Sequence, residues 1–144
     1  MKIRKAGLKD AYTLSVLTHR FFPYTGLGYA HVVARLKNPQ VEYFVAEEKG
    51  ATAGFTDVEH QDNGKAKILG LAVLPEFQRR GIGQALLSTA LEAAAGRGAA
   101  ECVILVAEDN ETARKLYDKN GFSRSGVLDR KLWNKTVLLM SKAL

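Results

Sequence analysis

Hydrophobic and polar residues follow two periods along the 144-residue chain, one typical of strands and the other of helices. Alternating or continuously apolar segments predict about seven strands, at residues 2–6, 41–47, 51–59, 65–74, 101–107, 122–128 and 135–142. Apolar residues spaced by three and four positions predict about four helices, at residues 8–22, 29–37, 86–95 and 112–120. Elements that alternate in this way predict an α/β fold with a mixed sheet, and no linker-like stretch divides residues 1–144 into two domains.

The predicted strand 65–74 carries most of the information about topology. Because a strand, a helix and a strand follow one another between residues 67 and 107, the two strands are expected to run parallel. Gly70 interrupts the first of them. An interior glycine marks a bulge or the close approach of another segment, or it is simply a weak point of the strand.

A phosphate-binding turn is predicted at residues 78–85, Gln-Arg-Arg-Gly-Ile-Gly-Gln-Ala, between an apolar strand and a helix. Gly81 and Gly83 have no Cβ, so an anion can approach the backbone, and a helix that begins here directs unpaired N–H groups at that anion. Arg79 and Arg80 add positive charge at the same place.

Other glycine-rich phosphate signatures do not match this segment. Leu86 stands where the dinucleotide-binding fingerprint requires a third small residue, and the P-loop and kinase companion residues are absent. The segment instead resembles the Gln/Arg-x-x-Gly-x-Gly/Ala signature of the GNAT-type N-acetyltransferase superfamily. A second segment, at residues 110–122, resembles that superfamily's Asn-x-x-Ala-x-x-Leu-Tyr-x-x-x-Gly-Phe element.

This resemblance implies a single-domain GNAT-like fold with a mostly antiparallel sheet, in which a central parallel strand pair splays around the cofactor. It implies acetyl-coenzyme A as the cofactor and acetyl transfer to a primary amine of a protein, peptide or small molecule. It places the cofactor site on residues from three segments: Leu71, Ala72, Val73, Gln78, Arg79, Arg80, Gly81, Ile82, Gly83, Gln84, Ala85, Asn110, Ala113 and Tyr117.

Tyr117 is the catalytic candidate that the resemblance names, with the task of protonating the departing thiolate. A phenol and a thiol have pKa values of about 10 and about 8.5, close enough for such a role. Asn110, Ala113 and Tyr117 share one helix face. A helix cap for Asn110 and a core position for Tyr117 are the alternative interpretations.

No general base is assigned, because Leu69, Leu71 and Val73 of one splayed strand and residues 104–106 of the other offer no carboxylate. Glu59, His60, Glu108 and Asp109 lie at strand ends and are the groups considered as bases acting through water, although acidic side chains at strand ends are usually just solvated. An α-amine, with a pKa of about 8, needs less help than a lysine at about 10.4, so this absence favours an α-amine or a water relay. By resemblance, the acceptor site is lined by residues 22–25, by Tyr29 and by the turn at residues 130–134.

The net charge of +6 favours an anionic partner such as coenzyme A, but the basic residues are spread along the chain, which makes nucleic acid an unfavoured partner. Cys102 is the single cysteine and lies in an apolar strand, where a core role is expected. No metal-ligand spacing occurs, so no metal site is expected. No apolar run is long enough to span a membrane, so a cytoplasmic location and no membrane partner are expected.

Three questions stay open. An acyl-coenzyme A sensor without turnover is the main alternative to an enzyme, and a nucleic-acid-binding domain is the second. A homodimer formed through the apolar strand 135–142 is a third expectation, which the resemblance suggests.

Overall fold

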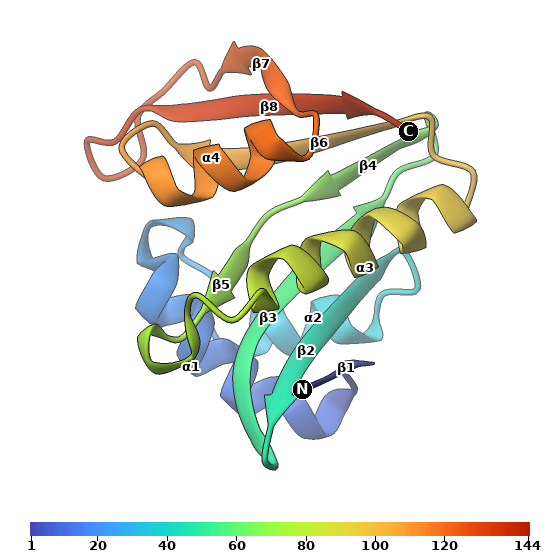
Figure 1. Ribbon diagram of the computed structural model, residues 1–144, viewed down its shortest axis with the longest axis vertical. Helices are drawn as coiled ribbons and strands as arrows, with labels where there is room; N and C mark the ends of the chain where they lie inside the picture. Colours follow the sequence, from blue (N-terminus) through green and yellow to red (C-terminus); the bar gives the residue numbers. More distant parts are fainter.

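An eight-stranded sheet forms the middle layer of the computed structural model, which describes residues 1–144, and α-helices cover both of its faces (Figure 1). The strands are β1 (Lys2–Lys5), β2 (Val41–Glu48), β3 (Ala51–His60), β4 (Lys65–Ile68), β5 (Leu71–Val73), β6 (Glu101–Ala107), β7 (Ser123–Val127) and β8 (Val137–Ala143). The α-helices are α1 (Ala11–Phe21), α2 (Tyr29–Lys37), α3 (Ile82–Gly96) and α4 (Glu111–Lys119).

The strands are arranged in the order β1-β2-β3-β4-β6-β8-β7, with β5 paired to β3. Every pairing is antiparallel except that of β4 with β6, which the crossover through α3 connects. The expected α/β class, the mostly antiparallel sheet and the central parallel pair are therefore confirmed.

The predicted continuous strand 65–74 is wrong, because the chain breaks between β4 and β5. β4 pairs with β6 as far as Ile68, opposite Ile104, whereas β5 turns away and pairs with β3 alone. Residues 105–107 of β6 consequently have no neighbour on that side, and the parallel pair splays as expected (Figure 1). The break separates one predicted strand into two, which accounts for an eighth strand.

The predicted helix 8–22 also differs, because its first turn, η1 (Leu8–Asp10), is a 3-10 helix. The Asp10 carboxylate accepts the Gly7 N–H and is held by Arg4 of β1, so these contacts fix a tighter turn than an α-helix has. At the other end of the sheet β8 lies between β6 and β7, and the edge strand is β7. Burial inside the sheet explains the apolar sequence of β8.

Two apolar clusters fill the layers on either side of the sheet. The larger contains residues of α3 and Tyr117 of α4, and the smaller contains Leu14, Leu17 and Val32 of α1 and α2. Strand alternation divides β5 between them, with Leu71 and Val73 on the α3 side and Ala72 on the α1 side. Cys102 is part of the larger cluster, as expected.

None of the helices is long and apolar enough to cross a membrane. No three His, Cys, Asp or Glu side chains gather where they could hold a metal ion.

Candidate active site

The turn before α3 presents a row of backbone donors at the surface. Arg79 and Gly81 both have left-handed backbone conformations, with φ of 65° and 79°, and Gly81 directly precedes the helix. No N–H group of residues 79–84 donates a hydrogen bond within the protein, whereas the Ala85 N–H already donates to the Gly81 carbonyl at 3.0 Å. Free N–H groups at a helix N-terminus are suited to an anion.

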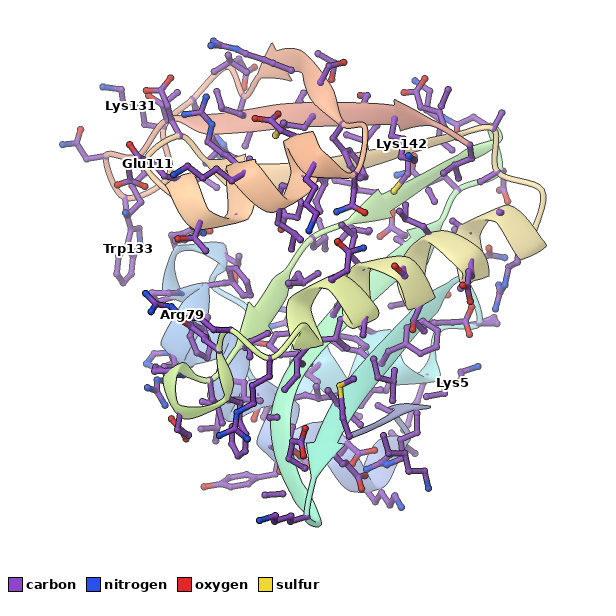
Figure 2. The ribbon with its side chains drawn as sticks, in the orientation of Figure 1. Lys5, Arg79, Glu111, Lys131, Trp133 and Lys142 are labelled. Carbon is purple, nitrogen blue, oxygen red and sulfur yellow. The ribbon has the colours of Figure 1, made fainter.

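The side chains of this turn divide into engaged and free groups. Gln78 Nε2 donates to the Val73 carbonyl at 3.1 Å, which ties the turn to β5. The guanidinium of Arg80 lies 5.5 Å from the centre of the Phe77 ring, in the turn η3 (Pro75–Phe77). Arg79 makes no ion pair or side-chain hydrogen bond and lies on the loop that precedes α3 (Figure 2).

Two of the predicted cofactor residues use their side chains within the protein. Gln84 and Asn120 exchange two amide hydrogen bonds of 2.8 and 2.9 Å, so the Gln84 side chain joins α3 to the end of α4. Ile82 is buried in the core and offers only its backbone N–H.

The backbone of β5 has one free edge. Its pairing with β3 uses Ala72, together with the Gly70 carbonyl and the Leu74 N–H on either side. Because alternate residues of a strand direct their polar groups to opposite sides, those of Leu71 and Val73 face the gap toward β6, where only the Val73 carbonyl already has a partner, Gln78 Nε2. An extended ligand can therefore hydrogen-bond to this edge as an added strand does.

Side-chain contacts bring the turn, β5 and α4 together. A Cβ added to Gly83 would lie 3.5 Å from Leu116 Cδ2, and 3.8 Å from both Leu71 Cδ2 and Val73 Cγ2. These are ordinary contacts, so the space at Gly83 does not itself demand glycine. The three predicted segments of the cofactor site thus meet at one place.

Tyr117 lies next to Leu116 on α4, with its ring packed 5.9 Å from that of Phe122. Its hydroxyl makes no hydrogen bond with the protein, and the single fully buried side-chain polar atom without a partner is His60 Nδ1. The Tyr117 oxygen therefore keeps contact with solvent although the ring is buried. Burial raises the pKa of the Tyr117 phenol well above its usual range, and the nearby Tyr24 and Asp57 add to the effect.

Asn110 caps α4, as the alternative interpretation expected, because its side-chain oxygen accepts the Ala113 N–H at 3.2 Å. Its amide nitrogen remains free for another partner. Ala113 is partly buried against the larger apolar cluster.

Of the predicted acceptor segments, residues 22–25 are the one whose Tyr24 lies near Tyr117. Tyr24 lies in η2 (Pro23–Thr25), and its pKa is raised chiefly by burial, with Asp109 adding to the rise and Lys135 opposing it. Asp109 and Lys135 form an ion pair of 3.0 Å between the β6–α4 and β7–β8 loops. Trp133, in the turn before β8, is largely exposed and projects from the protein (Figure 2).

The four groups considered as bases are engaged or exposed. Glu59 pairs with Arg35 at 3.7 Å and His60 pairs with Glu42 at 2.8 Å. Both residues lie in the part of β3 that pairs with β4, away from β5. Asp109 is held by Lys135, and the side chain of Glu108 is exposed. None of these four groups is therefore assigned as the general base.

Sequence reasoning missed Asp57, a buried carboxylate of β3 beside the break. An acidic residue in the interior of the predicted strand 51–59 was the available signal. Its partners come from distant segments, with Arg35 on one side and the Leu69 and Gly70 amides on the other.

The groups present fit coenzyme A. Free N–H groups and two arginines at the turn suit a pyrophosphate, and the open edge of β5 suits the amide groups of an extended arm. The Tyr117 hydroxyl, on the neighbouring helix α4, has no partner in the protein.

Comparison with known proteins identifies the family. The acetyltransferase (GNAT) family profile matches residues 9–122. An uncharacterized N-acetyltransferase of Bacillus subtilis (strain 168), YhfO, is 32% identical over 134 residues, which cover 85% of this chain and 89% of that protein. A putative ribosomal protein bS18-alanine N-acetyltransferase of the same organism is 29% identical over 105 residues, covering 73% of this chain and 68% of the relative.

Solved structures show the same fold. PaiA N-acetyltransferase of Thermoplasma acidophilum, in complex with coenzyme A, has a TM-score of 0.81 at 22% identity, over 99% of this chain and 98% of that chain. The ribosomal-protein-S18-alanine N-acetyltransferase of Escherichia coli has a TM-score of 0.83 at 21% identity, over 99% and 92% of the two chains. The chain therefore belongs to the GNAT family of acetyltransferases and is an acyltransferase.

Proposed function

We propose that the protein transfers the acetyl group of acetyl-coenzyme A to a primary amine of a protein, a peptide or a small molecule. The observation that carries this proposal is the run of unpaired N–H groups at residues 79–84, which lies beside the free edge of β5. A pyrophosphate and an extended amide-bearing arm would be bound by these two features together. Family membership and the coenzyme A complex of PaiA support the same cofactor.

In this proposal, the N–H groups of residues 79–84 and the two arginines hold the pyrophosphate. The backbone of Leu71 and Val73 holds the arm, with Asn110 and Ala113 on its other side. Bound acetyl-coenzyme A supplies the thioester. The side chains around Tyr117 then position the carbonyl carbon for attack by the amine nitrogen.

Tyr117 acts on the leaving sulfur. When the C–N bond forms and the C–S bond breaks, the amine loses one proton and the sulfur gains one, so the proton count balances. Because burial raises the pKa of Tyr117, its phenol stays protonated and can donate a hydrogen bond to the sulfur as negative charge develops there. The same hydroxyl can relay the proton that the amine releases.

The α-amine of a peptide is the acceptor that we propose to test first. Residues 104–106 of β6 and Leu71 and Val73 of β5 offer no carboxylate, and an α-amine with a pKa of about 8 needs the least help in losing its proton. Two similar proteins are named as alanine N-acetyltransferases of ribosomal protein S18, which supports this choice. We also propose a cytoplasmic location, with neither a nucleic-acid nor a membrane partner.

The test is release of the coenzyme A thiol from acetyl-coenzyme A, with coenzyme A binding measured by calorimetry. The panel pairs each peptide bearing a free α-amine with the same peptide blocked at its N-terminus, and adds lysine-containing peptides and small amines. Turnover that requires the free α-amine supports the proposed acceptor. Binding without turnover on any member would favour the sensor alternative, and absence of binding would contradict the cofactor assignment.

A further inference from the structure

We infer that Asp57 is a positioning residue that holds open the break between β4 and β5, and thereby creates the free strand edge for the cofactor arm. The inference rests on the proposed cofactor and extends it to a residue that would not touch the cofactor. Asp57 lies in β3, is almost fully buried and has no other role in the proposed chemistry.

The carboxylate binds the two amides at the break itself. Asp57 Oδ1 accepts the Leu69 N–H at 3.2 Å and the Gly70 N–H at 2.9 Å. In an uninterrupted strand 65–74, one of two successive amides would point to β3 and the other to β6. By taking both of them, Asp57 removes the donor that would continue the ladder between the parallel strands.

The carbonyl of Gly70 is held in the same way. Thr56 Oγ1, which is fully buried, donates to it at 2.8 Å, and the Asp57 N–H donates at 3.4 Å. Phe22 closes the other side, since a Cβ on Gly70 would lie 2.7 Å from Phe22 Cε2. A side chain at residue 70 would therefore displace the Phe22 ring, which agrees with the close approach that was one of the interpretations open from the sequence.

Arg35 of α2 orients the Asp57 carboxyl group. Its Nη2 donates to Asp57 Oδ2, and its Nε donates to the Tyr43 hydroxyl at 3.0 Å. Burial raises the pKa of Asp57, while Arg35 and the two amides oppose that rise. The three hydrogen bonds fix the position of the carboxyl group and connect α2 to the strand break through Arg35.

Asp57→Ala tests the inference, because it removes the acceptor of both amides. We expect coenzyme A binding, measured by calorimetry well below the unfolding temperature, to weaken at least about tenfold. Asp57→Asn keeps an oxygen for the amides and should recover part of the affinity. Thr56→Val, which removes one donor to the Gly70 carbonyl without changing volume much, is the milder variant if Asp57→Ala fails to fold.

Asp10→Ala is the matched control. Asp10 is also a buried carboxylate that binds one arginine and one backbone amide, but it lies at the start of α1 beside β1. The Asp10→Ala substitution should lower the unfolding temperature and change coenzyme A affinity by less than about twofold. Equal affinity losses in Asp57→Ala and Asp10→Ala would reduce Asp57 to a general structural role.

Amide hydrogen exchange without any ligand separates this inference from the cofactor assignment. We expect the Leu69 and Gly70 amides to be protected in the wild type and to exchange rapidly in Asp57→Ala, while β8 amides are unchanged. If the wild type does not bind coenzyme A, the proposed function fails, but these exchange rates still test the role of Asp57 at the break. Unchanged exchange at both amides, or unchanged coenzyme A affinity in Asp57→Ala, would overturn the inference.

Discussion

The ring and the hydroxyl of Tyr117 lie in different environments. The ring is buried against Phe122, whereas the hydroxyl has no partner in the protein. Tyr117→Phe should therefore keep the free energy of unfolding within about 0.5 kcal/mol, since it removes no intramolecular hydrogen bond. We expect turnover to fall about 100-fold with coenzyme A affinity unchanged, as for loss of a proton-transfer group. Thiol release together with calorimetry measures both quantities, and full turnover in the variant would refute the catalytic role.

Cys102 is the other residue for which burial decides the chemistry. Burial raises the pKa of the Cys102 thiol to about 12. Because the thiolate is the reactive form, we expect no reaction with Ellman's reagent at neutral pH until denaturant unfolds the protein. The folded protein also retains the thiol proton more tightly than the unfolded chain does. This contribution to stability is complete below the unfolded pKa of about 8.5 and decreases as the pH rises toward 12. Comparing the wild type with Cys102→Ala isolates it, and rapid labelling of the folded protein would contradict the assigned burial.

The segment from η3 into α3 is the element whose backbone conformation matters most. A Cβ at Gly81 would meet no protein atom within 4 Å, so glycine is favoured there by its φ of 79° and not by lack of space. Gly81→Ala should therefore cost about 1–2 kcal/mol in the conformation that binds the anion and weaken coenzyme A binding about tenfold. Gly81→Glu adds a negative charge at the same place and should weaken binding further.

Gly83→Ala is the control for that element. Its Cβ would make only ordinary contacts with Leu116, Leu71 and Val73, and alanine favours a helix. Coenzyme A affinity measured by calorimetry should stay within about twofold of the wild type. A loss equal to that of Gly81→Ala would show that small size, and not the left-handed conformation, is what the turn requires.

At the scale of the whole molecule, the first edge of the sheet is held by a charged group. The hydrogen bonds from Arg4, with that of the Gly7 amide, hold the pKa of Asp10 below its usual value although burial opposes them. The folded carboxylate binds its proton less tightly than in the unfolded chain. Its contribution to stability is therefore present above the unfolded pKa of 3.8 and is lost as the pH falls through the lower folded value.

Acid denaturation followed by circular dichroism checks this prediction. Between about pH 5 and pH 3, the wild type should lose more stability than Asp10→Asn, whose side chain does not titrate in this range. Parallel curves for the two proteins would exclude Asp10 from the acid transition.

What the sequence determined by itself was the part of the fold that depends on local spacing. The order of helices and strands, the parallel crossover and the turn at Gly81 follow from periodicity and from glycine placement over short stretches. Motif resemblance added the family, which the comparisons confirm. It also named the cofactor residues, whose roles stay predictions.

Tertiary structure decided where the strand 65–74 breaks and what surrounds Tyr117. The break depends on Asp57 and Arg35, which lie 13 and 35 positions before Gly70 in the chain and reach it only through packing of β3 and α2. The placement of Tyr24 near Tyr117 likewise depends on the return of a loop from the other layer. Local periodicity contains no information about such contacts, because a buried charge is stabilised by partners that folding brings together.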